Sequence, residues 1–299
     1  MASLREIRRK IKSVKSTEQI TKAMKMVAAA RMRRAQLSII SARPFAVRLE
    51  DLCRALAFRI GKNSASEAAH FPPSLKEYFQ SGPHGASLIV LVAADKGLCG
   101  AFNSNLIRTS LGLMQRQNQK FYAIAVGRKS RDFFRRLKGF DCEVLHEMTG
   151  IFPKVSFTHA EILGQEILKA YFEKKLSSVI VVYNEFKSVA QQKLVEFPIL
   201  PIAPLSEEAP GTLVDYEFEP KEEDLLGVLL PRYLKAQIYR ILLESQAAEL
   251  SARMNAMDAA SKNAKELRGS LNLSLNRQRQ AMITKEIAEL VGGAEALAS

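Results

Sequence analysis

Two glycine-containing turns carry the residue types from which a phosphate site could be built. One is Asp95-Lys96-Gly97-Leu98-Cys99-Gly100, and the other is Gly127-Arg128-Lys129-Ser130; each follows an apolar run. Neither has the G-x-G-x-x-G spacing of a dinucleotide loop, and neither has the G-x-x-x-x-G-K-[ST] spacing of a P-loop. Gly97 and Gly100 therefore favour a tight turn between a strand and a helix. An anion or nucleotide site at that turn is the alternative.

Nucleophilic and metal chemistry find equally little support. Cys99 could act as a nucleophile, but no histidine lies near it, and the four histidines of the chain form no motif. The three cysteines, Cys53, Cys99 and Cys142, have no metal-binding spacing, and we interpret them as reduced thiols. H-E-x-x-H, G-x-S-x-G and C-x-x-C patterns are absent from the sequence. We therefore expect a protein with no active site, metal or cofactor of its own.

The charge of the chain is concentrated at its beginning. The 299 residues include 44 Lys and Arg against 31 Asp and Glu, a formal net charge of +13. Residues 1–60 contain 15 Lys and Arg against 4 Asp and Glu, and thus hold a net +11. Such a segment predicts an acidic partner, which could be nucleic acid, anionic lipid or an acidic protein surface. A solvated helix face is the simpler interpretation of the same pattern.

The basic segment also has a helical apolar repeat. It has no glycine between residues 3 and 58 and a single proline, Pro44, which predicts a kink or a helix end there. Apolar residues follow the spacing of a coiled-coil stripe, namely Ile7, Ile11 and Val14, then Ile20, Met24 and Val27, and then Leu37. A helix of this length would span roughly 80 Å.

The C-terminal part mirrors this pattern. Between Pro231 and Leu290 it has one glycine, Gly269, and we expect Pro231 to lie in a first helical turn. Steps of four and three residues from Leu250 trace an imperfect seam over Met254, Met257, Ser261, Ala264, Arg268, Leu271, Leu275, Gln278 and Met282. Helices this long exceed the width of a compact domain, so we predict that they pair with each other as an antiparallel coiled coil.

The middle of the chain alternates strands with helices, which predicts an α/β domain with a mostly parallel sheet. We expect strands at 87–93, 121–126, 141–145, 179–183 and 192–197, and helices at 104–116, 129–137 and 158–175. Thr158 and Glu161 have the spacing of a capping box at the start of the last helix. The predicted segments are 1–60 (N-terminal coiled-coil helix), 61–85 (linker), 86–222 (α/β domain) and 223–299 (C-terminal coiled-coil helix).

The longest apolar run is too short to span a membrane, and we expect neither a signal peptide nor a transit peptide.

Five segments together resemble one family, the γ subunits of bacterial F-type ATP synthases. They extend from one end of the chain to the other: residues 4–34 (LREIRRKIKSVKSTEQITKAMKMVAAARMRR), 95–103 (DKGLCGAFN), 183–188 (YNEFKS), 252–257 (ARMNAM) and 279–287 (RQAMITKEI). The resemblance implies a coiled coil of the two terminal helices beside a central Rossmann-like α/β domain. It also implies a central rotor shaft that turns inside the α3β3 hexamer, above the ε subunit and the membrane c-ring. ATP, ADP and Mg²⁺ would then be bound by the α and β subunits.

The resemblance also assigns contact residues. Met24 and Lys25, with the basic helix around them, match positions near an acidic lever loop of the β subunit. Arg279, Gln280 and Thr284 match residues that hydrogen-bond a β loop, and Arg253 and Glu289 match positions implicated in coupling. Tyr216, Phe218 and Glu219 match the foot region that meets ε and the ring. For each, the simpler alternative is an ordinary solvated or seam residue of a helix.

Further expectations distinguish the rotor-shaft interpretation from two alternative hypotheses. Residues 190–230 contain no cysteine, so we expect no thiol switch of the chloroplast type, and we expect a location at the cytoplasmic face of a bacterial inner membrane. One competing hypothesis is a basic coiled coil that binds nucleic acid, although Phe45 and Phe58 are the only aromatic residues of residues 1–60. The other is a nucleotide-binding α/β enzyme, although this sequence has no phosphate-loop motif.

Overall fold

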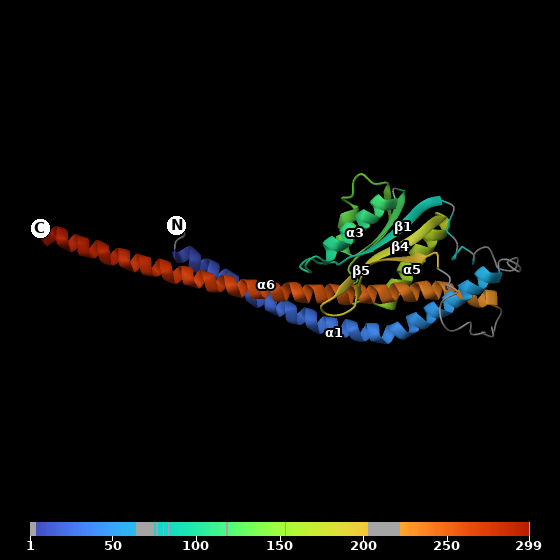
Figure 1. The fold of residues 1–299 in the computed structure, drawn as a ribbon, viewed down its shortest axis with the longest axis horizontal. Coiled ribbons are helices and arrows are strands. Elements are labelled where there is room, and N and C mark those ends of the chain that lie inside the picture. The colour runs from blue at the N-terminus through green and yellow to red at the C-terminus, as the bar shows by residue number, and fades with distance from the viewer. Residues whose placement is uncertain are drawn as a thin grey trace. The chain divides into compact units, whose positions relative to one another are not determined.

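A computed structural model describes residues 4–63, 75, 77–79, 81–82, 84–117, 119–152, 154–202 and 222–298. In the sequence, one long helix precedes a mixed α/β segment and a second long helix follows it (Figure 1). The elements are α1 (Leu4–Asn63), β1 (His84–Val92), α3 (Phe102–Gln117), β2 (Phe121–Val126), α4 (Arg128–Phe134), β3 (Cys142–Met148), α5 (Phe157–Glu173), β4 (Leu176–Phe186), β5 (Gln192–Leu200) and α6 (Glu222–Ala298).

The five strands form one sheet in the order β3-β2-β1-β4-β5. The pairs β3–β2, β2–β1 and β1–β4 are parallel, because a helix connects each strand to the next in the chain. β5 runs antiparallel to β4, because it returns directly through a tight turn in which Ser188 and Gln191 exchange backbone hydrogen bonds. The predicted α/β class with a mostly parallel sheet is confirmed.

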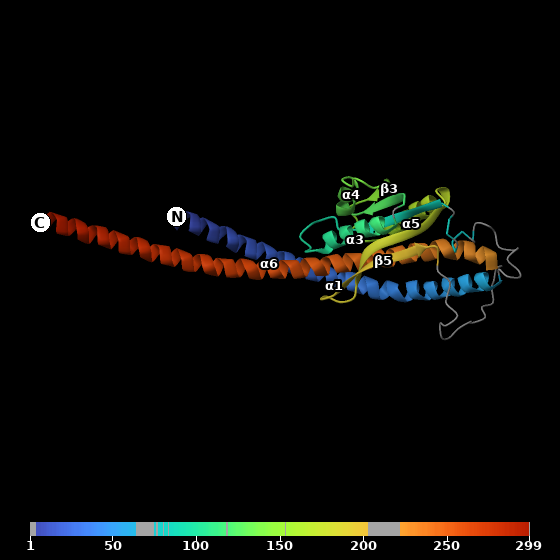
Figure 2. The same cartoon turned by 45° about the horizontal axis from the view of Figure 1, so that its top comes forward.

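Helices cover both faces of this sheet (Figures 1 and 2). Leu88, Val90 and Val92 point to the face covered by α5 and α6, and Ile89 and Leu91 point to the face covered by α3 and α4. A strand buried on both faces must be apolar at every position, which is why the middle strands read as continuous apolar runs.

The start of α5 differs from the prediction. The N-cap is Ser156, whose N–H donates to Nδ1 of His159 at 3.0 Å. The capping box predicted at Thr158 and Glu161 is therefore wrong, because the helix already includes Thr158. Ser156 and His159 have the right spacing, but histidine is not the Glu or Gln that the capping pattern seeks.

The two long helices have close to the predicted extents, but both continue through a proline. α1 is helical through Pro44 to Asn63, and α6 begins at Glu222. Pro231 therefore lies inside α6, and its predicted place in the first turn is wrong. No described helix is long and apolar enough to cross a membrane.

The chain forms two compact units whose limits fall within α1 and α6. The first contains the residues up to Ala29 together with those from Arg253 onward, and the second contains Ala30–Ala252. In the second unit Leu49 and Cys53 of α1 share a core with Leu230 and Leu234 of α6 and with the sheet. The four predicted segments remain a prediction, and most of the proposed linker 61–85 lies outside the described residues.

Candidate functional site

In the first unit, the face of α1 that packs against α6 follows a repeat of four and three residues. Its buried or half-buried positions are Ile7, Ile11, Val14, Glu18, Thr21, Lys25 and Ala28. The predicted continuation through Ile20 and Val27 is wrong, because these side chains are 58% and 53% exposed. Leu37, further along α1, is also exposed. The repeat beyond Val14 passes through polar residues, so a search for apolar residues moves onto the wrong face.

The seam predicted on α6 is correct over most of its length. Every position of it from Met254 to Gln278 is buried or half-buried, and from 265 to 278 all the residues between these positions are exposed. Met282, the last predicted position, is 45% exposed. The paired part of α6 therefore ends close to Gln278.

Two ion pairs join the helices and fix their antiparallel register. Lys25 Nζ lies 2.6 Å from Asp258 Oδ1, and Arg268 Nε lies 3.0 Å from Glu18 Oε2. Asp258 also contacts Lys262 Nζ at 3.0 Å. The hydrogen bond from Lys25, followed by that from Lys262, lowers the pKa of the Asp258 carboxyl. Lys25 is thus a half-buried member of the helix seam.

The other predicted contact residues on the helices lie in two environments. Met24 and Arg253 are half-buried, whereas Arg279, Gln280 and Thr284 are exposed. Glu289 is exposed as well and pairs with Lys285 at 3.4 Å. The structure therefore places Arg279, Gln280 and Thr284 together on one stretch of α6, and Met24 and Lys25 together on α1. Tyr216, Phe218 and Glu219 lie outside the described residues.

The end of α6 exposes apolar side chains as well as polar ones. All residues from 279 to 291 are exposed, and the large apolar ones are Met282, Ile283, Ile287, Leu290 and Val291. Figure 1 shows this stretch continuing past the N-terminal end of α1. A helix with exposed apolar residues around Arg279 and Gln280 is suited to a binding site on another protein.

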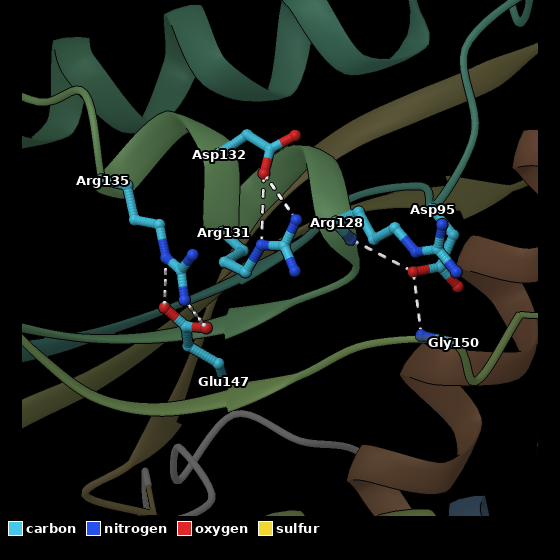
Figure 3. Close-up of polar contacts among 7 residues, drawn as sticks. All are labelled: Asp95, Arg128, Arg131, Asp132, Arg135, Glu147 and Gly150. Atoms are coloured by element: carbon cyan, nitrogen blue, oxygen red, sulfur yellow. Dashed lines mark hydrogen bonds and ion pairs between the residues drawn. The ribbon is translucent and has the colours of Figure 1, made fainter.

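The turn after β1 is held by its own polar groups. The Asp95 carboxylate accepts hydrogen bonds from the backbone N–H groups of Arg128 at 3.1 Å and Gly150 at 2.9 Å, as Figure 3 shows. A longer bond of 3.5 Å comes from the N–H of Phe152. Asp95 therefore ties together the loops that follow β1, β2 and β3. Sequence reasoning missed this role, for which an aspartate directly after an apolar strand is the available signal.

The thiols are placed in packing rather than in a reactive cluster. Cys99 is buried, and its Sγ accepts a hydrogen bond of 3.1 Å from Asn103 Nδ2. Burial raises the pKa of Cys53 to about 12 and that of Cys142 to about 11, with a smaller contribution from Glu50 and Asp141 respectively. Thiolates, the reactive form, are therefore scarce at Cys53 and Cys142 near neutral pH. The described residues contain no cluster of His, Cys, Asp and Glu able to hold a metal ion.

Comparisons with known proteins agree with the resemblance of the sequence. A family model described as ATP synthase matches residues 3–297. The ATP synthase gamma chain of Elusimicrobium minutum is 43% identical, with 99% of both chains covered, and that of Pelotomaculum thermopropionicum is 43% identical, with 99% of this chain and 100% of the relative covered.

Solved structures share the fold. The central stalk and c-ring structure of the Tetrahymena thermophila mitochondrial ATP synthase contains a chain that matches with a TM-score of 0.59 and 24% identity, covering 81% of this chain and 99% of that one. A chain in the OSCP/F1/c-ring structure of the Euglena gracilis mitochondrial ATP synthase matches with a TM-score of 0.62 and 18% identity, covering 98% and 94%. The end-to-end identity to the bacterial relatives, together with the family model, shows that the chain belongs to the ATP synthase gamma chain family.

Proposed function

We propose that this chain is the central rotor shaft of the F1 sector of an ATP synthase. It couples ion flow through the membrane ring to the synthesis or hydrolysis of ATP on the β subunits by rotating. The observation that carries the proposal is the paired long helices with an exposed, partly apolar end, in a chain 43% identical to gamma chains over nearly its whole length.

The helix pair is physically suited to this role. Transmission of torque requires an element that resists twisting, and a continuous helix pair with a buried seam does so better than loops. α6 is helical over 77 residues, and in the first unit its seam contacts α1 through both apolar packing and ion pairs. Turning past three β subunits also requires that no single contact be strong. Exposed ion pairs meet this requirement, because each contributes about 1 kcal/mol or less.

The proposed partners rest on charge and on the resemblance of individual positions to the family. Exposed basic residues of α1, which include Lys12, Lys15, Lys22, Arg31, Arg33 and Arg34, would face acidic surfaces of the β subunits in the α3β3 hexamer. Met24 and Lys25 would meet the acidic lever loop of β. Arg279, Gln280 and Thr284 would hydrogen-bond a β loop, and Arg253 and Glu289 would act in coupling. Tyr216, Phe218 and Glu219 would contact the ε subunit and the c-ring.

The chemistry would remain on other subunits. We propose that the α and β subunits bind ATP, ADP and Mg²⁺, and that this chain contributes no cofactor or catalytic group. It would be a peripheral protein at the cytoplasmic face of a bacterial inner membrane, held there only through the complex. Nucleic acid would not be a partner.

Reconstitution tests the proposal directly. The chain is mixed with α and β subunits, ATP hydrolysis is measured, and rotation is followed with a bead fixed to the α/β domain. We expect rotation in three steps per turn, and loss of coupling when residues 280–299 and further residues before them are deleted. A chain that neither joins α3β3 nor changes its ATPase activity would overturn the proposal.

A matched pair of substitutions sharpens the test at the residue level. Arg279 and Arg277 are both exposed on α6, but they lie about 200° apart around the helix. Arg279→Ala should lower the hydrolysis rate of the reconstituted complex several-fold, and Arg277→Ala should leave it nearly unchanged. Equal effects of the two substitutions would contradict the assigned contact.

A further inference from the structure

An open apolar groove lies between α3 and α4, in the second unit. Its volume is about 390 Å³, and its apolar lining consists of Ile107 and Leu111 from α3 together with Phe133 and Leu137 from α4 and the turn after it. All four side chains are half-buried rather than enclosed. This volume accommodates a few large side chains of a ligand.

α3 carries apolar residues beyond the face that it packs against the sheet. Leu106, Leu113 and Met114 are buried against the sheet and satisfy the requirement for one apolar face. Ile107 and Leu111 are one helical turn apart and form a second apolar line directed at the groove. α3 also contacts α4 on this side, but that contact leaves Ile107 and Leu111 only half-buried.

Positive charge surrounds this apolar floor. Lys129, Arg136 and Lys138 line the groove, and Asp132 is the only acidic residue among the described residues that line it. The Asp132 carboxylate is already paired with Arg131, whose Nη2 lies 2.9 Å from Oδ1, as Figure 3 shows. That hydrogen bond lowers the pKa of Asp132, so the carboxylate stays ionised and its charge is balanced by Arg131. The three remaining cations give the rim a net positive charge.

We propose that the α3–α4 groove is the docking site for an acidic amphipathic helix of a partner protein. Apolar residues of that helix, at spacings of three and four, would enter between Ile107, Leu111 and Phe133. Asp and Glu residues beside them would pair with Lys129, Arg136 and Lys138. The combination of an apolar floor and a cationic rim selects this occupant, because phosphate groups would use the rim but leave the floor exposed to water. The groove shares no residue with the contacts assigned to α1 and α6. The docking proposal can therefore be tested separately from the proposed function.

The test uses the full chain and two helical peptides of about 15 residues, a length that a stabilised helix needs. Both peptides carry Leu and Phe on one face; one has Glu beside that face and the other has Lys. Binding is followed by fluorescence anisotropy, with circular dichroism to verify the folding of each variant. We expect the acidic peptide to bind in a saturable, salt-sensitive manner and the basic peptide to bind at least tenfold more weakly.

Variants then locate the site. Arg136→Glu with Lys138→Glu should weaken binding of the acidic peptide about tenfold, since two partly exposed ion pairs are reversed. Ile107→Ser should weaken it without changing its salt dependence. Lys193→Glu, an exposed charge reversal on β5 outside the groove lining, is the matched control and should bind as the unaltered chain does.

Four outcomes would overturn the proposal. Equal binding of both peptides, or binding unaffected by the groove variants, would show that the groove does not select an acidic helix. Absence of saturable binding by the acidic peptide would do the same. Self-association of the chain that Ile107→Ser abolishes would identify a second copy as the occupant instead.

Discussion

Glu244 is a carboxylate with 1% of its surface exposed, on a face of α6 that packs within the second unit. Tyr183 of β4 donates a hydrogen bond of 3.4 Å to its Oε2, and Arg43 of α1 lies 3.8 Å from its Oε1. Burial raises the pKa of Glu244 above its ordinary value, Glu185 adds to this, and Arg240 and Arg43 oppose it. The folded chain therefore holds a proton on Glu244 at pH values where the unfolded chain has released it.

This predicts a stability that decreases as the pH rises. The contribution of Glu244 is fully present below the unfolded pKa of about 4.5 and is lost as the pH rises through the higher folded pKa. Glu244→Gln keeps a neutral side chain at every pH, so its melting temperature should fall less between pH 4.5 and pH 8 than that of the unaltered chain. Thermal melts across this range measure the difference. Glu143→Gln, at an exposed position, is the control, and a parallel loss in all three proteins would contradict the assignment.

Gly127 gives a second prediction at the residue scale. Its φ of +89° is rare for other residues, and an added Cβ would collide with the backbone carbonyl of Ala93. Gly139 has a φ of +81° but open space around it. Gly127→Ala should lower the free energy of unfolding by roughly 2–4 kcal/mol, because it adds a steric clash to the backbone strain. Gly139→Ala should lower it by only about 1 kcal/mol, because this variant adds backbone strain without a clash. Urea unfolding of both variants measures the difference, and similar losses would show that the close approach of Ala93 is unimportant.

At the scale of elements, the helix pair of the first unit depends on charges within its seam. Arg268→Glu would place two carboxylates together, and adding Glu18→Arg would restore an ion pair in the opposite sense. A double-mutant cycle on thermal or urea unfolding should show a coupling of roughly 0.5–1 kcal/mol, the range for partly exposed pairs. Arg277→Glu, exposed on the same helix, should show no coupling to Glu18→Arg. A coupling of zero for both pairs would mean that apolar packing alone fixes the register.

The elements differ in how well their sequences predict them, and the reason is burial. β1, β2 and β4 are buried on both faces, so their apolar runs predicted them within a few residues. From Met254 to Gln278 the seam of α6 has Met or Leu at half of its positions, which is enough for steps of four and three residues to predict it. The seam of α1 passes through three polar residues, Glu18, Thr21 and Lys25. Glu18 and Lys25 form ion pairs with α6, and the Thr21 hydroxyl donates to a backbone carbonyl one turn earlier. The apolar stripe therefore predicted the wrong face of α1.

The candidate site shows a similar limit. Arg279, Gln280 and Thr284 could be assigned only by resemblance, because exposed residues of a helix have no periodic signal that marks a partner. Asp95 and the α3–α4 groove depend on loops and helices that the fold brings together from distant parts of the sequence. Local patterns therefore identify the elements, and the tertiary arrangement identifies these surfaces.

At the scale of the whole molecule, the uneven charge has consequences for the free chain. A net +11 over residues 1–60 should attract any polyanion, whether or not it is a natural partner. We expect the isolated chain to bind duplex DNA at 50 mM salt and to lose at least about a hundredfold in affinity by 200 mM, with no preference among sequences. Anisotropy titrations with two unrelated duplexes measure this. Binding that persists at high salt would favour a nucleic-acid function, and ATP hydrolysis by the chain alone would favour an enzyme.

α6 is a single helix from Glu222 to Ala298. Because each residue of a helix is rotated by a fixed angle from the one before it, the direction of every side chain depends on the number of residues that precede it. One residue inserted at 260 would turn every later residue by about 100°, so that Ala264, Arg268 and Leu271 would all leave the seam with α1. An insertion of seven residues would return them to within about 20° of their original direction. Changes of length during evolution should therefore be rare within α6 and, where they occur, should come close to whole heptads, while the loops of the α/β segment remain free to vary.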